Sequence, residues 1–113
     1  MSESILTSIK KLLGITEEYE QFDPDILMHI NSVFMILTQI GVGPESGFSI
    51  QDDSSKWADF VSDINKIEAI KSYIYLKVRL LFDPPTSSST MEAINSLISE
   101  LEWRLNVIVD TNV

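Results

Sequence analysis

Apolar residues recur at helical spacing in four segments of the chain, and none of these segments alternates strictly, as a half-buried strand does. The four segments cover about residues 2–13, 24–40, 63–82 and 89–106. Trp57 and Phe60, in a shorter stretch around residues 56–61, predict one further, short helix. This pattern predicts an all-α protein, a small helical bundle of about four helices with a long central helix.

Residues that start or stop helices lie at the ends of the first two segments. Lys10 lies in the last turn of the first segment and Gly14 just beyond it, and a cation followed by glycine is typical of a helix C-terminus. Asp23 is a good N-cap for the second segment, and Pro24 suits its first helical position. Gly41 then ends the second helix.

The third segment carries two apolar stripes on different sides. One stripe contains Ile67, Ile70, Ile74, Val78 and Leu81, and the other contains Ala69, Tyr73, Leu76 and Leu80. From Tyr73 onward the helix is apolar nearly all round, interrupted by Lys77 and Arg79. Such a helix is enclosed on several sides, so it is either the central element of the fold or contacts both its own fold and a neighbouring subunit.

Two segments favour extended backbone. Residues 48–50 predict a short strand or an extended clip. Residues 107–113 are rich in β-branched side chains, which favours an extended C-terminal tail that could pair with a partner.

Ser89 and Glu92 fit a capping box at the start of the fourth helix. We therefore expect one helical domain over residues 1–106, followed by an extended tail over residues 107–113.

The composition is that of a globular protein with an acidic balance. The 113 residues are 44% hydrophobic and 22% charged, and 8 basic against 17 acidic side chains leave a net charge of −9. This charge argues against a protein that binds the phosphate backbone of nucleic acids, because such binding depends on lysine and arginine side chains. Without cysteine, disulfides and cysteine-ligated metal sites are excluded. We expect no membrane span and no signal peptide, with the cytosol as the default compartment.

Candidate catalytic chemistry is sparse. The single histidine, His29, lies at the edge of an apolar helical stripe, where a packed or boundary histidine is the ordinary interpretation. The acidic pairs Asp23/Asp25 and Asp52/Asp53 precede helices, where aspartate caps backbone N–H groups. The loop after Gly41 lacks the glycine and lysine of phosphate-binding motifs. We therefore predict no catalytic, cofactor or metal site, and a protein that is not an enzyme.

Surface apolar groups point instead to protein contacts. Met28 and Met35 lie seven residues apart on the polar face of the second helix, and Trp103 lies on the polar face of the fourth. Methionine and tryptophan are enriched in interfaces. The predicted subunit or partner contacts are Met28, Met35, Tyr73, Leu76, Lys77, Arg79, Leu80 and Trp103.

A set of motifs in fixed order resembles a known family over nearly the whole chain. The most specific is Lys71-Ser-Tyr-Ile-Tyr-Leu-Lys-Val-Arg-Leu-Leu-Phe-Asp-Pro-Pro85. It is preceded by Ile5-Leu-Thr-Ser-Ile-Lys-Lys-Leu-Leu-Gly14, Phe22-Asp-Pro-Asp-Ile-Leu27, Gln39-Ile-Gly-Val-Gly-Pro44 and Trp57-Ala-Asp-Phe60, and followed by Glu100-Leu-Glu-Trp-Arg-Leu-Asn106. Together they resemble the small head–tail connector, or adaptor, proteins of long-tailed double-stranded DNA bacteriophages.

The resemblance implies a structural role in the virion. It implies a helical fold, a dodecameric ring beneath the portal protein, a downstream connector or tail-completion protein as the next partner, and no catalysis. Double-stranded DNA would pass through the ring without sequence-specific binding, and the protein would lie at the head–tail interface after assembly in the host cytoplasm. Side-to-side contacts in a ring are heterologous, so each subunit needs two different complementary faces.

The residues alone leave two other functions as alternatives. The low pI near 4.3 and the small size also fit an acidic phage-encoded inhibitor that mimics DNA and binds a host nucleic-acid-binding protein. His29 and the acidic pairs are the sole motivation for a small enzyme.

Overall fold

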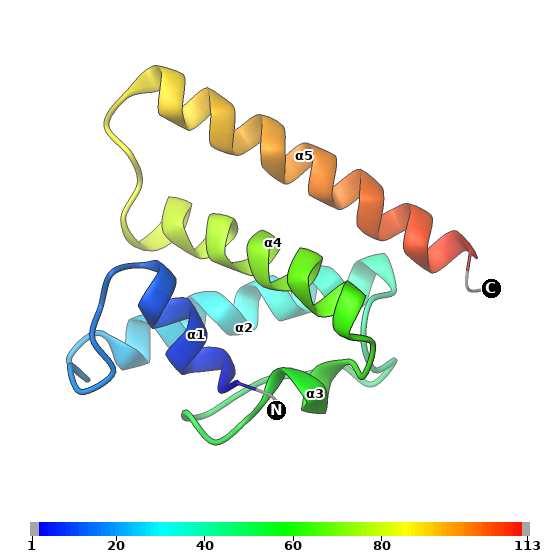
Figure 1. Cartoon of the computed structure of the whole chain (residues 1–113), viewed down its shortest axis with the longest axis horizontal. Coiled ribbons are helices and arrows are strands. Elements are labelled where there is room, and N and C mark those ends of the chain that lie inside the picture. The colour runs from blue at the N-terminus through cyan, green and yellow to red at the C-terminus, as the bar shows by residue number, and fades with distance from the viewer. Residues whose placement is uncertain (1–2, 112–113) are drawn as a thin grey trace.

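The computed structural model describes residues 3–111, which form five α-helices (Figure 1). The helices are α1 (Ile5–Leu12), α2 (Asp23–Ile40), α3 (Trp57–Phe60), α4 (Ile64–Phe82) and α5 (Ser88–Thr111). No strand is present within residues 3–111, so the predicted all-α class is confirmed. All four long predicted segments and the short one are helical, with boundaries close to those expected except at the end of α5.

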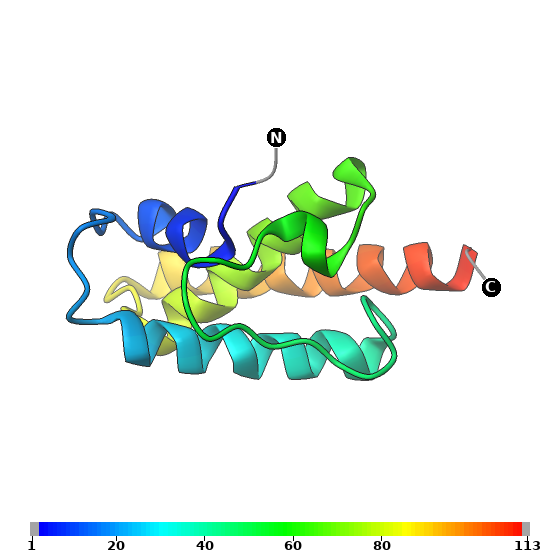
Figure 2. The ribbon, with the colours of Figure 1, turned by 90° about the horizontal axis from the view of Figure 1, so that it is seen from below.

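The central helix is α4, which packs against α1, α2 and α5. Figure 1 shows α5 along one edge of the molecule and α3 near the opposite edge, and Figure 2 shows α2 as a layer beneath α4. The fully buried side chains of α2 and α4 are Ile26, Ile30, Val33, Phe34, Leu37, Ile70, Tyr73, Ile74 and Val78. Packing against three other helices of the same chain therefore accounts for the two apolar stripes of α4.

The C-terminal end of α5 corrects the prediction of an extended tail. The helix continues to Thr111, so extended backbone is wrong for residues 107–111, and residues 112–113 lie outside the described part of the chain. β-branched residues cost a helix only about 0.5 kcal/mol each relative to alanine. Each residue added to the end of an existing helix also gains one backbone hydrogen bond. The prediction of an extended tail considered the β propensity of these residues but not this gain.

The start of α5 also differs from the predicted capping box. The helix begins at Ser88, and Oγ of Ser87 accepts the N–H of Thr90 over 3.4 Å. Ser87 rather than Ser89 thus occupies the capping position. The run of serine and threonine after Pro85 offers several equivalent caps, so spacing alone did not select among them.

The connection between α2 and α3 is held by contacts to distant residues. Oδ1 of Asn31 accepts the N–H of Ile50 over 2.8 Å, and Nδ2 of Asn31 donates to the carbonyl of Ile50 over 2.9 Å. The segment 48–50 is therefore an extended clip rather than a strand. Farther along, Ser4 and Lys56 form an isolated antiparallel bridge, which fixes the residues before α1 beside the start of α3.

Candidate interaction surfaces

The outer face of α2 presents the two predicted methionines to solvent. Met28 and Met35 are 58% and 65% exposed, and Ser32 between them is also exposed. The core of the protein contacts the opposite side of α2, through residues such as Ile30 and Phe34. The predicted exposure of both methionines is confirmed, and this face is accessible to a partner.

Two of the predicted contacts on α4 are core residues. Tyr73 is fully buried and Leu76 is 7% exposed, so neither is accessible at the surface of the folded chain. The Tyr73 hydroxyl donates to Oε2 of Glu102 on α5 over 2.8 Å, and burial, with this bond as the second cause, raises the pKa of Tyr73. Tyr73 and Leu76 are therefore removed from the candidate interface, because packing within one chain explains their apolar character.

The other predicted α4 residues lie at the margin of the core. Lys77, Arg79 and Leu80 are each half-buried. Nζ of Lys77 lies 3.8 Å from Oε2 of Glu102, and a guanidinium nitrogen of Arg79 donates to the Tyr75 hydroxyl over 3.4 Å. These side chains are occupied by contacts within the chain but still reach the surface.

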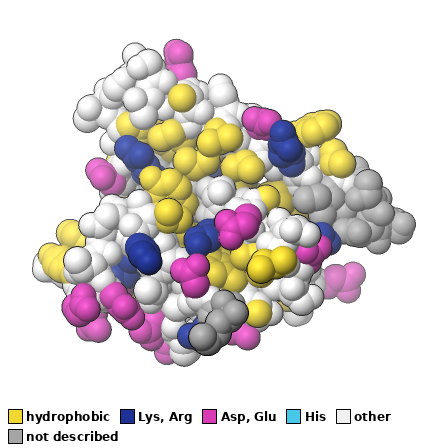
Figure 3. All heavy atoms as spheres, viewed as in Figure 1, with side chains coloured by type: hydrophobic (Ala, Val, Ile, Leu, Met, Phe, Trp, Pro, Cys, Tyr) yellow, Lys and Arg dark blue, Asp and Glu magenta, His cyan; other side chains and the backbone are white. Residues whose placement is uncertain are grey.

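Trp103 is the single aromatic residue of α5. It is 66% exposed, whereas its neighbour Glu102 turns toward α4 and accepts the Tyr73 bond. Val107, one turn farther on, is 39% exposed, and Arg104 pairs with Glu100 over 2.8 Å on the same surface. Figure 3 shows hydrophobic side chains gathered over the α4–α5 region, while carboxylates concentrate around the α1–α2 connection.

A cavity of about 310 Å³ opens between α3 and the N-terminal part of α4. Trp57, Ile64 and Ile67 supply its apolar lining, and Ile64 is 72% exposed. At its rim, Nζ of Lys71 donates to Oε1 of Glu3 over 3.2 Å, and this bond is the main cause that lowers the pKa of Glu3. No local sequence pattern marks this cavity, since its walls come from three separate segments of the chain.

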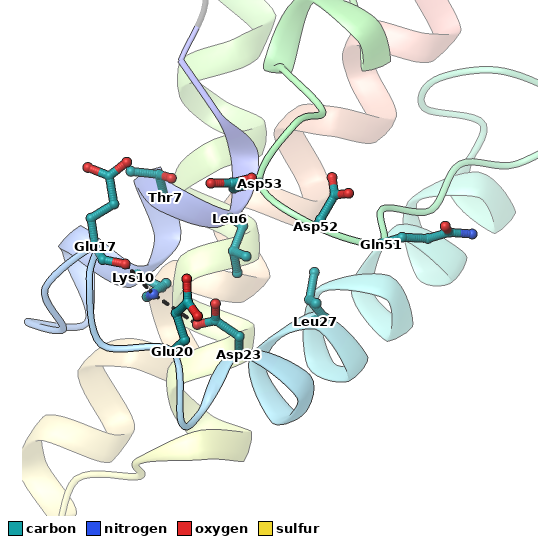
Figure 4. Close-up of a pocket in the computed structure, with 10 residues that line it drawn as sticks. All are labelled: Leu6, Thr7, Lys10, Glu17, Glu20, Asp23, Leu27, Gln51, Asp52 and Asp53. Carbon is teal, nitrogen blue, oxygen red and sulfur yellow. Dashed lines mark hydrogen bonds and ion pairs between the residues drawn. The ribbon is translucent and has the colours of Figure 1, made fainter.

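A second cavity, of about 260 Å³, lies between α1, the start of α2 and residues 51–53 (Figure 4). Inside it, Nζ of Lys10 donates to the carbonyl of Glu17 over 3.0 Å and lies 2.9 Å from Oδ1 of Asp23. Lys10 is 3% exposed, so the predicted helix-terminal cation is in fact a buried residue that joins two segments.

Carboxylates surround the mouth of this second cavity. Glu17, Glu20, Asp52 and Asp53 line it together with the Lys10–Asp23 pair. Hydrogen bonds from the side chain and the backbone of Ser54 lower the pKa of Asp52. The cavity thus combines a buried ion pair with a negatively charged rim.

Neither cavity contains an arrangement typical of metal binding. Across the described part of the chain, no three His, Cys, Asp or Glu side chains are grouped so that they could hold a metal ion. His29 is half-buried on α2. Among the helices of residues 3–111, none has the length and apolar character needed to cross a bilayer.

Comparison with known proteins identifies one family. The sequence model of a family described as phage connector protein matches residues 5–112 of this chain. The match includes all five helices and, apart from Glu3, the residues named above that line the two cavities. No curated protein and no solved structure matches the chain.

Proposed function

This chain belongs to the phage connector protein family, and we propose that it forms a ring-shaped adaptor between the DNA-filled head and the tail of a phage. The observation that carries the proposal is the family match over residues 5–112, nearly the whole chain. The all-α fold agrees with it, since the earlier resemblance implied a helical protein. A dodecamer beneath the portal protein is the assembly that we propose.

The exposed apolar side chains support self-association. Met28 and Met35 on α2 and Trp103 on α5 leave large hydrophobic groups in water on different helices. In a ring, every subunit uses one surface toward the preceding copy and a different surface toward the next. We propose these three residues as contacts to subunits or partners, with Lys77, Arg79 and Leu80 at the margins of the contact.

The acidic charge suits a passage for DNA. A net charge of −9 repels phosphate, by the same electrostatics through which basic clefts attract it. An acidic lining would therefore let double-stranded DNA slide through the ring without being trapped. In this proposal the ring contacts the portal protein on one side and a downstream connector or tail-completion protein on the other, within the virion.

The proposed role is structural and involves no reaction or cofactor. Before incorporation into the virion, the subunits would be present in the host cytoplasm. Their contribution would be geometric: they would provide a binding surface for the next protein while keeping the DNA path open.

The proposal is tested on particles that contain the portal protein. We expect electron microscopy of such particles to show a ring of this protein on the portal, and particles that lack it to fail to attach tails. Normal tail attachment and infection without the protein would overturn the proposal. Abundant protein in infected cells but none in finished virions would overturn it in favour of the acidic inhibitor of a host nucleic-acid-binding protein.

A further inference from the structure

Trp103 projects from the surface as an isolated aromatic side chain. It is 66% exposed on α5, and Arg104 beside it is the one basic residue of the last 30 positions. Exposed tryptophan with neighbouring arginine is typical of the side chains that dominate binding energy at protein interfaces. Helix α5, which carries Trp103, lies along one edge of the molecule (Figure 1).

The cavity between α3 and α4 has the complementary properties. Its volume of about 310 Å³ and its lining of Trp57, Ile64 and Ile67 suit one apolar ring. This volume lies at the lower end of the range of roughly 300–1,000 Å³ typical of pockets that enclose a whole small ligand. Helix α3, which forms one wall, lies near the edge opposite to α5 (Figure 1).

Charge at the cavity rim matches the surroundings of Trp103. Glu3 and Glu68 against Lys71 leave the rim with an excess of negative charge. Glu68 is exposed and makes no ion pair with another residue of the described chain. Arg104 pairs with Glu100 at an exposed position of its own helix, and an incoming Arg104 would gain Glu68 as a second carboxylate. Complementary charge therefore favours contact between these two surfaces.

We propose that the Trp103 side chain of one copy inserts into the cavity lined by Trp57, Ile64 and Ile67 of the next copy. The inference deepens the proposed function and rests on it, because it names the subunit contact of the ring. A projection at one edge and a cavity near the other cannot be satisfied within a single chain. They produce a head-to-tail contact, which closes into a ring when the rotation between copies is suitable.

The direct test places a photo-reactive benzoyl-phenylalanine at position 103, which keeps an aromatic group there. After irradiation of portal-bound particles, we expect covalent multimers larger than dimers, with cross-linked peptides that contain Ile64 or Ile67. The matched control carries the same amino acid at Ser96. Ser96 is exposed and lies seven residues earlier on the same face of α5, about 10 Å away, so it should not cross-link to this cavity.

A charge exchange tests the orientation of the contact. We expect Arg104→Glu to reduce incorporation into portal-bound particles by about tenfold. Adding Glu68→Lys should restore most of the incorporation. Adding Glu45→Lys instead, the same charge change at an exposed position that lines neither cavity, should restore little of it. Circular dichroism and native mass of each variant show that the subunit still folds.

The outcomes separate this inference from the proposed function. Rings visible on the portal together with cross-links from position 103 to the portal, to another protein or to another surface would overturn the inference and leave the adaptor function intact. Dimers alone would also overturn it, because a symmetric pair replaces the head-to-tail contact. Absence of the protein from portal-containing particles would overturn both.

Discussion

The hydroxyl group of Tyr73 donates to Oε2 of Glu102 over 2.8 Å and so joins the buried centre of α4 to α5. Nζ of Lys77 lies 3.8 Å from the same carboxylate oxygen and 5.8 Å from the centre of the Tyr73 ring. A fully buried aromatic residue is thus combined with a partly exposed charge pair. The contact fixes the position of α5, the helix that carries the exposed Trp103.

Removing this hydroxyl should weaken the attachment of α5. Tyr73→Phe keeps the ring in the core but loses the bond to a charged acceptor, for which we expect a loss of about 1.5 kcal/mol in the free energy of unfolding. Urea unfolding at pH 7 measures it. Tyr75→Phe is the matched control, since the Tyr75 hydroxyl takes part in a long 3.4 Å bond from Arg79 at a half-buried position and should cost less than about 0.5 kcal/mol. Equal losses in the two variants would contradict the assigned role of Tyr73.

The same residue predicts how stability changes at high pH. Burial, followed by the bond to Glu102, raises the pKa of Tyr73 above the ordinary tyrosine value of about 10. The folded state therefore holds this proton more tightly than the unfolded state does. Its contribution to stability is complete below about pH 10 and is lost as the pH rises through the raised pKa. The stability gap between the wild type and Tyr73→Phe should accordingly stay constant up to about pH 10 and narrow above it, and a gap that does not change above pH 10 would contradict this.

The ion pair of Lys10 and Asp23 should also be structural. Oδ1 of Asp23 is buried and accepts no hydrogen bond within the described residues, so the Lys10 ammonium, 2.9 Å away, serves as its counter-ion. Lys10→Met keeps the length of the side chain but removes the counter-ion of that carboxylate and the donor to the Glu17 carbonyl, so we expect a loss of about 3 kcal/mol in unfolding free energy. Lys10→Met combined with Asp23→Asn should lose less, because no unpaired charge remains. Thermal or urea unfolding of the single and the double variant gives both free energies. If Lys10→Met caused only a packing defect, adding Asp23→Asn would restore no stability.

Local sequence patterns were sufficient to predict the helices but not the contacts between distant segments. Apolar spacing located α2 and α4 within one residue, because amphipathic periodicity reports burial directly. Burial of Lys10 depends on Asp23, thirteen residues away, and the order of residues 48–50 depends on Asn31. No local pattern encodes such pairs, since they arise only when the helices pack together.

For the candidate surface, too, local patterns predicted exposure but not contacts between helices. Exposure of Met28, Met35 and Trp103 followed from their place on polar helix faces and is confirmed. Tyr73 and Leu76 could not be assigned, because a stripe that packs on another helix of the same chain has the same pattern as one that packs on a neighbour. The cavity lined by Ile64 was not predicted, since an exposed isoleucine near a helix N-terminus carries no distinctive spacing.

Two glycines with the same backbone conformation give a matched test of the loop after α2. Gly14 and Gly43 have φ angles of +83° and +88°, which disfavour any L side chain. A methyl group at Gly14 would meet nothing, whereas one at Gly43 would overlap the ring of Phe60. We expect Gly14→Ala to cost about 1 kcal/mol, and Gly43→Ala about 2 kcal/mol more, because the added methyl overpacks the core.

The ring of Phe60 gives this comparison a local readout. Its centroid lies 4.8 Å from that of Phe34 and 5.1 Å from that of Phe48, so displacement of Phe60 should disturb both neighbours. Aromatic NMR shifts of these three residues should change in Gly43→Ala and stay the same in Gly14→Ala. Identical unfolding free energies for the two variants would show that the loop moves aside without cost.

A pair of aspartate substitutions separates folding from assembly. Leu76 is 7% exposed and Met35 is 65% exposed, although both were predicted as contacts. Leu76→Asp places an unpaired charge in the core and should cost more than about 4 kcal/mol, enough to unfold most of a domain this small. Met35→Asp should leave the circular dichroism spectrum and the unfolding midpoint unchanged, because the side chain is already in water.

If the outer face of α2 contacts a neighbouring protein in the particle, Met35→Asp should still reduce incorporation by at least about tenfold, since the charge must then be desolvated. Wild-type incorporation of Met35→Asp and of the corresponding Met28→Asp variant would remove this face from the proposed contacts while leaving the Trp103 contact untouched.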